Sequence, residues 1–174
     1  AQYRLGKLLL KGDDGIPKDV ITAIRWLTAA AKQENGYAEY ALALVYLTGE
    51  DAPKDSVKAL SLLKRSAGRG NQFAQYRLGK LLLQGEDAPK DVKAAIRWLT
   101  AAAEQGNQYA QYALGKLYLL GKEVPKDRSS AIKWFQLAAD QGNEYAQYFL
   151  KHMDDRLGQP PVAAVISLFH HLAN

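Results

Sequence analysis

Apolar residues in this chain recur at helical spacing, and the same arrangement returns every 36 or 37 residues. In the segment 74–84, for example, Ala74, Leu78 and Leu82 stand four residues apart and share one face of a helix. An opening of Ala, then Gln or Glu, then Tyr marks each copy, and it begins at Ala1, Ala38, Ala74, Ala110 and Ala146. A fixed period of this size is typical of an all-α solenoid, an α/α superhelix of stacked two-helix repeats.

Each complete copy contains two predicted helices separated by a loop with Gly and Pro. The first helices are expected at 1–11, 38–48, 74–84 and 110–120, and the second helices at 20–33, 56–69, 92–105 and 128–141. A Gly ends each first helix, and a Pro a few residues later prevents its continuation. The residues placed to cap the second helices are Asp19, Asp55, Asp91 and Asp127.

Two recurring features predict how these helices pack. Small residues stand in the middle of the first helices, at Gly6, Ala43, Gly79 and Gly115. Because Gly in a helix costs about 1 kcal/mol relative to Ala, we expect a neighbouring helix to approach closely there, with the alanines at 29–31 and 101–103 as the matching surface. Large residues recur at one position of the second helices and are expected to be core anchors, namely Trp26, Leu62, Trp98 and Trp134.

Both ends of the repeat array depart from the pattern. In the later copies a Gly-Asn pair follows the second helix. In the first copy Glu34-Asn35-Gly36 stands there instead, which predicts a turn of different geometry. In the fifth copy Lys151 replaces the small residue, and Asp154-Asp155 replaces an apolar pair, as expected of a solvated end. Apolar residues on one face then predict a capping helix after Pro160 and Pro161, with Val162, Val165, Ile166, Phe169 and Leu172. We therefore expect ten helices: four two-helix repeats plus the first helix of a fifth at 1–156, and a Pro-initiated cap at 157–174.

Composition narrows the class of protein. The chain is 48% hydrophobic and 24% charged, which fits a soluble folded protein, and no apolar run approaches the roughly 20 residues of a membrane span. The absence of cysteine excludes disulfides and Cys-based sites and fits a reducing compartment, so we expect a cytoplasmic location. Because residue 1 stands at the start of a repeat, we also expect the chain to be part of a longer protein.

No recognisable catalytic or metal-binding motif is present. His170 and His171 are adjacent, about 100° apart on a helix, and do not form the i, i+4 pair of zinc motifs. The acidic residues at 50–51 and 86–87 lack calcium-loop spacing and are interpreted as solvated loop charge. The segments 1–12 and 74–85 differ only at one position, whereas an active site needs one copy to differ chemically. We therefore expect no enzymatic activity, no cofactor and no metal.

The less apolar face of the first helices holds the third, fourth and seventh positions of each copy. Over the four first helices there are six basic residues and one acid, Glu39, a balance of +5 that equals the formal net charge of the chain. The predicted partner-binding residues are Tyr3, Arg4, Lys7, Tyr40, Tyr76, Arg77, Lys80, Tyr112 and Lys116. Two interpretations are open: these residues contact a partner, or the tyrosines pack between repeats while the cations only solvate the face.

The repeat resembles the Sel-one-like repeat family, a relative of the tetratricopeptide repeats. The resemblance covers about residues 1–150, and in the fourth copy it rests on Leu114-Gly115, Leu117-Tyr118, Gly121, Pro125, Asp127, Ala131, Trp134, Ala138-Ala139 and Gly142-Asn143. It implies a solenoid that scaffolds protein complexes without chemistry of its own, with the first helices on the concave side. The tail 162–174 is similar to the end of some Gram-positive mobilisation proteins, relaxases that carry such repeats.

These observations favour a non-enzymatic protein-interaction module that binds a partner segment along the first-helix face. The partner is expected to be acidic, with apolar anchors. An alternative is an accessory module of a DNA-mobilisation relaxase, since the sequence pI of about 9.3 permits contact with nucleic acid. A secreted or periplasmic inhibitor is a third reading, which the lack of cysteine and of a nucleophile disfavours. No membrane partner is expected, and weak dimerisation is expected through the uncovered face of Ala1, Leu5 and Leu8.

Overall fold

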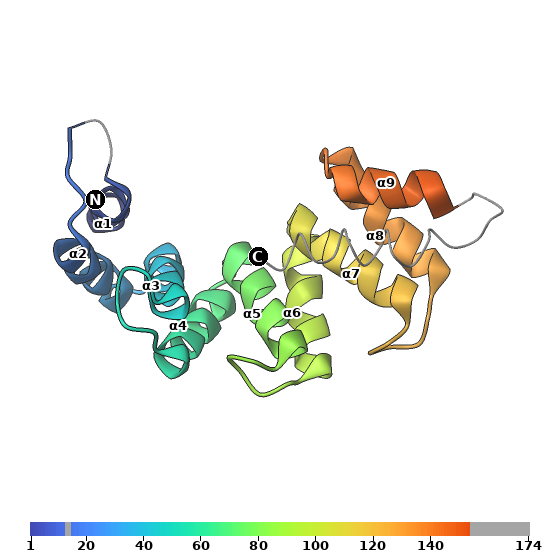
Figure 1. Cartoon of the computed structure of the whole chain (residues 1–174), viewed down its shortest axis with the longest axis horizontal. Helices are drawn as coiled ribbons and strands as arrows, with labels where there is room; N and C mark the ends of the chain where they lie inside the picture. The colour runs from blue at the N-terminus through green and yellow to red at the C-terminus, as the bar shows by residue number, and fades with distance from the viewer. Residues whose placement is uncertain (13–14, 154–174) are drawn as a thin grey trace. The chain divides into compact units, whose positions relative to one another are not determined.

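The computed structural model, which describes residues 1–12 and 15–153, contains α-helices in the order that the repeat predicts (Figure 1). The nine helices of this part of the chain are α1 (Gln2–Lys11), α2 (Val20–Lys32), α3 (Gly36–Thr48), α4 (Ser56–Gly68), α5 (Gln72–Gln84), α6 (Val92–Glu104), α7 (Gln108–Leu120), α8 (Arg128–Asp140) and α9 (Glu144–Met153). The predicted all-α solenoid is confirmed. The tenth helix, at 157–174, and Asp154-Asp155 lie outside the described residues.

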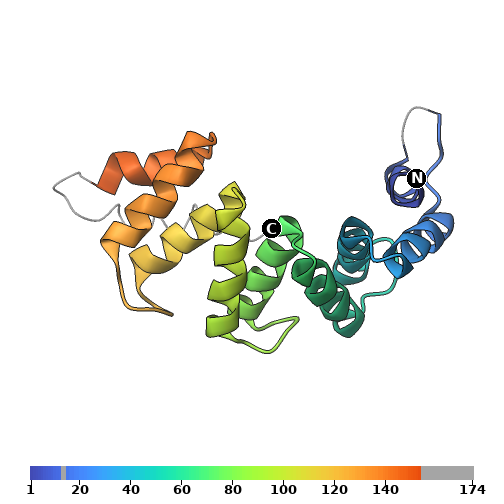
Figure 2. The same ribbon diagram turned by 180° about the vertical axis from the view of Figure 1, so that it is seen from behind.

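The chain forms two compact units, one from Ala1 to Ala110 and one from Gln111 onward. In the first unit each helix packs against the next, and the first and second helices of a repeat lie side by side, as α5 and α6 do in both views (Figures 1 and 2). In the second unit α8 packs against α9, around a core that contains Phe135 and Phe149. Within each compact unit, helices that follow one another in the chain therefore pack against one another.

Helix starts are fixed by polar side chains that accept the free amide hydrogens of the first turn. The four predicted aspartate caps are confirmed, and the Oδ1 of Asp91, for example, accepts the amide of Ala94 at 2.9 Å. Hydrogen bonds from the side chain and amide of Thr22 lower the pKa of the Asp19 carboxyl. Each such cap is worth about 1 kcal/mol.

The first helices of the second to fourth copies begin two residues before the predicted starts. The reason is the Asn directly before each of these helices: its side chain accepts amide hydrogens of the first turn, as Asn71 does from Phe73 and Ala74. Asn35 and Asn107 act in the same way. The Asn after the second helix of each preceding copy is therefore the N-cap of the next first helix.

The turn at Glu34 has the same geometry as its counterparts, so the expected difference is wrong. Glu34 has a φ of 62°, and the Gly at the equivalent position of later copies, Gly70, has a φ of 86°. The amides that follow, of Asn35 and Asn71, each donate to a helix carbonyl at 3.2 Å. A left-handed conformation costs a non-Gly residue about 1–2 kcal/mol, and here Glu34 also pairs with Arg69 at 3.1 Å.

The predicted close approach at the mid-helix glycines is confirmed. A Cβ added to Gly79 would lie 2.7 Å from the Leu99 Cγ and 3.0 Å from the backbone oxygen of Ala95. The same clash would occur at Gly6 with Leu27, and at Gly115 with Phe135. The surface that faces the glycine therefore lies in the first turn and the middle of the second helix, not at the alanines 29–31 and 101–103.

The tryptophans are not the centre of the core, which corrects the prediction. Trp26 is 37% exposed, and Trp98 is partly buried against the edge of the core. The fully buried side chain is the next one along each second helix, and the set is Leu27, Leu63, Leu99 and Phe135. Neighbouring residues point about 100° apart on a helix. When the following residue fills the inner face, the Trp position therefore lies at the margin of that face.

Two details concern charged residues that the sequence assigned to solvent. Lys151 is exposed, as the prediction of a solvated end requires. The loop aspartates are not merely solvated, because Asp51 pairs with Lys18 at 2.5 Å and Asp87 pairs with Lys54 at 2.8 Å. Each pair joins the loop of one repeat to the loop of the next, so these carboxylates help to fix the spacing of adjacent repeats.

Candidate interaction surface

The most regular surface feature is a series of aromatic ring pairs between the first helices of adjacent repeats. In the first unit the ring centroids of Tyr3–Tyr37, Tyr40–Phe73 and Tyr76–Tyr109 lie 5.9, 6.2 and 6.0 Å apart, all tilted. We call this series the aromatic ladder. Such ring pairs contribute about 0.5–1.5 kcal/mol beyond their buried area, so the ladder helps to join the repeats.

The two rings of each ladder pair differ in exposure. The inner rings, Tyr3, Tyr40 and Tyr76, are half-buried. The outer rings are more exposed, at 56% for Tyr37, 43% for Phe73 and 54% for Tyr109. In the second unit Tyr112 and Tyr145 form the equivalent pair at 6.0 Å, with Tyr145 exposed.

The outer rings were missed in the sequence analysis. The signal that could have found them is an aromatic residue directly before the Ala of the second to fifth openings, three positions before the inner tyrosine. Positions i and i+3 lie on the same helix face, so the two aromatic rows run along one side of the first helices. The inner tyrosines therefore do pack between repeats, and the outer rings are the part of the ladder that is open to contact.

The predicted cations differ in their surroundings. Arg4 and Lys7 of α1 are exposed, whereas Arg77, Lys80 and Lys116 are half-buried. Burial lowers the pKa of the Lys80 amine, and the nearby charge of Arg77 lowers it further. The cations of the candidate site are therefore not one uniform solvated stripe.

Arg77 lies close to several groups of the ladder. Burial raises the pKa of Tyr40 and of Tyr76, and the positive charge of Arg77 partly opposes both shifts. The Nε–H of Arg77 is buried, and none of the residues that the structure describes supplies it with a hydrogen-bond acceptor.

Glu39, the single acid in the charge count of the first helices, does not contribute to this face. Its side chain is fully buried and forms ion pairs with Arg65 at 2.6 Å and with Arg69 at 3.2 Å. In the later copies glutamines occupy the positions of Glu39 and Arg69 and form neutral pairs. Gln105 donates to Gln75 and Gln141 donates to Gln111, each at 2.7 Å. The acid therefore serves packing within the second repeat.

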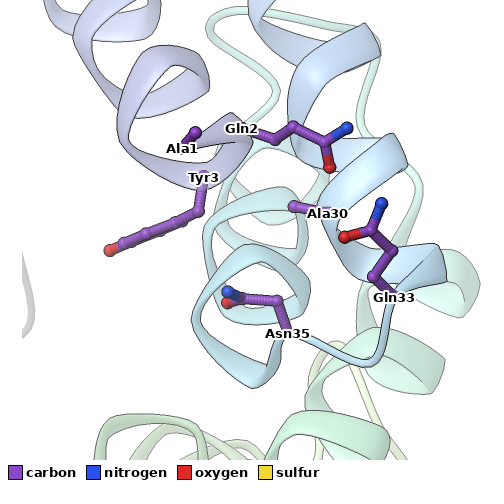
Figure 3. A pocket seen from close by; sticks show the side chains of 6 residues that line it. All are labelled: Ala1, Gln2, Tyr3, Ala30, Gln33 and Asn35. Carbon is purple, nitrogen blue, oxygen red and sulfur yellow. The ribbon is translucent and has the colours of Figure 1, made fainter.

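The first repeat carries the equivalent glutamines at a small open pocket. Gln2 and Gln33 line it together with Ala1, Tyr3, Ala30 and Asn35, and Figure 3 shows the two amides pointing toward one another. The Tyr3 ring points away from them (Figure 3). Leu5 and Leu8, where dimerisation is expected, are exposed.

The described residues give little support for other kinds of site. Within the two described ranges, 1–12 and 15–153, no group of three or more acidic or histidine side chains is placed to hold a metal ion. The Nδ1–H of His152 donates to the carbonyl oxygen of Tyr148 in its own helix, at 2.8 Å. His170 and His171 lie outside the described part of the chain. Among the helices that are described, none is long and apolar enough to cross a bilayer.

Solved structures with the same architecture come from several bacteria. A protective antigen of uropathogenic Escherichia coli with an SLR fold, c5321, is 34% identical at a TM-score of 0.82, over 87% of this chain and 32% of that one. A Sel1 repeat protein of Oxalobacter formigenes is 35% identical at a TM-score of 0.79, over 88% and 44%. This chain therefore spans less than half the length of either relative.

A third structure shows the fold alone. Cysteine-rich protein B of Helicobacter pylori is 22% identical at a TM-score of 0.60, over 76% of this chain and 95% of that one. No curated protein sequence gives a significant match. Nothing in these comparisons supports the resemblance of the tail to relaxases, and the tail at 162–174 lies outside the described residues.

The family follows from the repeats themselves. The sequence profile of the Sel1 repeat matches four consecutive segments, 1–35, 36–71, 72–107 and 108–143. The last three begin at the first residue of α3, α5 and α7, where the asparagine caps place the helix starts. With four matched repeats and two relatives above 30% identity over most of its length, this chain belongs to the Sel1 repeat family.

Proposed function

We propose that this chain is a non-enzymatic interaction module that binds a segment of another protein along the aromatic ladder. Sel1 repeats are generally protein-interaction modules and generally not catalytic. The observation that carries the proposal is the row of exposed outer rings, Tyr37, Phe73 and Tyr109, each supported by an inner tyrosine.

The physical reason is the behaviour of aromatic side chains at interfaces. They offer a large contact area with few rotatable bonds, and they are enriched among the residues that dominate binding energy. Contact with the neighbouring ring further restricts each outer ring before a partner arrives. The partner segment that suits this surface has apolar anchors for the rings and acidic residues for the cations nearby.

The test is selection of random displayed peptides on the protein, followed by calorimetry with the strongest peptide. A triple variant, Tyr37→Ala, Phe73→Ala and Tyr109→Ala, should weaken binding by about tenfold or more per ring that acts as a hot spot. A matched control is Ile21→Ala with Val57→Ala, because these exposed apolar side chains lie on the second helices. The control should bind as the wild type does.

Three outcomes would contradict the proposal: no peptide is selected, the triple variant binds equally well, or the control loses as much affinity.

Nucleic acid is tested with a labelled oligonucleotide, since displacing several phosphate counterions gives a steep dependence of affinity on salt. Tighter binding of the oligonucleotide than of any peptide would replace the proposed partner class. Thermal melts accompany each variant, with Trp98→Ala as the reference for lost packing.

A further inference from the structure

Arg77 and Lys80 of α5 have the same residue types as Arg4 and Lys7 of α1, at the same positions of the repeat, but different surroundings. The pair on α1 is exposed, and the pair on α5 is half-buried. Partial burial removes water from the α5 pair and leaves its charges less screened than those on α1. An anion beside Arg77 and Lys80 therefore interacts more strongly than one beside Arg4 and Lys7.

The α5 pair also lacks a counter-charge of its own. In the described part of the chain neither Arg77 nor Lys80 forms an ion pair, and the buried Nε–H of Arg77 has no acceptor. Asp87 is near enough for Arg77 to lower its pKa, after the larger effects of Lys54 and Ser56. It is already bound by the amine of Lys54 at 2.8 Å and the hydroxyl of Ser56 at 2.7 Å. Its charge is therefore largely satisfied.

Apolar and aromatic groups adjoin this pair. Phe73 and Arg77 stand four residues apart on α5, as do Tyr76 and Lys80, so each cation shares a helix face with a ring of the ladder. On α3, the positions equivalent to Arg77 and Lys80 are occupied by Ala41 and Leu44, which are half-buried. A ligand at this place meets two cations beside the rings of α5, and the ring pair Tyr40–Phe73 joins α5 to α3, where the equivalent positions are apolar.

We propose that Arg77 and Lys80 form a carboxylate-binding subsite of the aromatic ladder. It selects partner segments in which Asp or Glu stands next to an aliphatic or aromatic residue. The guanidinium and ammonium groups donate to the carboxylate, and the neighbouring apolar residue contacts the rings and the α3 positions. This subsite rests on the proposed function, because it fixes the register of a segment that the ladder holds.

The experiment uses two double variants with the same change in net charge. Peptides are selected on the wild type, on Arg77→Gln with Lys80→Gln, and on Arg4→Gln with Lys7→Gln. We expect the wild type and the α1 variant to enrich peptides with an acid beside an apolar residue. The α5 variant should lose that preference and bind the wild-type peptide at least about tenfold more weakly.

The outcomes separate this subsite from the wider function. If no peptide is selected on the wild type, the proposed function fails and the subsite fails with it. If peptides bind through the outer rings but show no acidic preference, or if both double variants lose equal affinity, only the subsite is overturned. Equal losses would mean that the whole charge of the face attracts the peptide.

The type of anion is tested with one selected peptide in three forms, carrying Glu, Gln or phosphoserine at the acidic position. The Glu form should bind best, and its advantage over the Gln form should disappear in the Arg77→Gln, Lys80→Gln variant. If the phosphoserine form binds at least about tenfold more tightly than the Glu form, a phosphate-bearing partner replaces the carboxylate. If the Gln form binds as well as the Glu form, the subsite does not recognise charge.

Discussion

The segments 1–12 and 74–85 differ at a single residue, yet the structure places them in two environments. Leu5 is 38% exposed, whereas its counterpart Leu78 is fully buried. Among the described helices α1 packs against α2 and more lightly against α3, while α5 is held between α4 and α6. The comparison shows that burial along this chain is set by the neighbouring repeat, since the local sequence is the same.

The same comparison extends to charge. Arg77 and Lys80 lose part of their hydration against the adjoining repeat, and Arg4 and Lys7 keep theirs. Near-identical helices therefore offer different electrostatic environments to a partner. In a repeat protein, a distinct site can arise from position in the array without any change in the residues that form it.

The largest effect should come from truncating the two equivalent leucines. Leu78→Ala should lower the free energy of unfolding by about 3 kcal/mol, because it leaves a cavity between α4, α5 and α6. Leu5→Ala should cost about 1 kcal/mol, since its side chain is partly in water already. Chemical denaturation of both variants measures the difference, and equal losses would show that α1 is as well covered as α5 in solution.

A second, smaller effect concerns the glycine in the middle of α5. Gly79→Leu should destabilise the chain by about 2 kcal/mol, because even its Cβ would lie 3.0 Å from a backbone oxygen of α6. The matched control is Lys151→Leu at the equivalent position of α9, which is exposed and should change stability by less than about 0.5 kcal/mol. Thermal melts test both, and a comparable loss in the control would contradict the packing of the repeat.

The smallest effect is electrostatic and concerns Lys80. Arg77→Gln should raise the pKa of the Lys80 amine toward the ordinary value of 10.5, because the charge of Arg77 contributes to the lowering. Arg4→Gln should leave that pKa unchanged. Nuclear magnetic resonance of the lysine side chains measures it directly, and an unchanged value in the Arg77 variant would show that the two cations do not interact.

The sign of the pH dependence follows from the same shift. The pKa of Lys80 is lower in the folded than in the unfolded chain, so between the two values the unfolded chain binds more protons. The contribution of Lys80 to stability therefore rises with pH through that interval. Arg77→Gln should narrow the interval and flatten this part of the stability profile.

Much of the fold could be predicted from the sequence. The 36-residue period, the Asp caps and the Gly-Pro loops placed the second helices within one residue of their observed ends. These features act through local hydrogen bonds and backbone preferences, which neighbours along the chain suffice to determine. The Asn caps and the left-handed Glu34 are also local, and a closer comparison of the copies would have found the first of them.

The candidate surface was only partly predictable. Periodicity identified the inner tyrosines and the cations. The outer rings Tyr37, Phe73 and Tyr109 follow only from the structure, in which each of them contacts an inner tyrosine of the preceding first helix. Likewise, the charge count of the first helices included Glu39, and the structure buries it against Arg65 and Arg69. Contacts between different helices depend on residues some 30 positions apart, which a wheel of one helix does not contain.

By itself, the sequence determined that this protein is a stack of two-helix units, where the second helices begin and end, and which small residues allow the helices to approach. Only the tertiary structure decided that the residue after each Trp position fills the core, that identical leucines differ in burial, and that Arg77 and Lys80 lack a counter-charge among the described residues. The reason is physical: hydrogen bonds and backbone preferences act over a few residues of chain, whereas hydration and charge screening depend on every group that lies nearby in space.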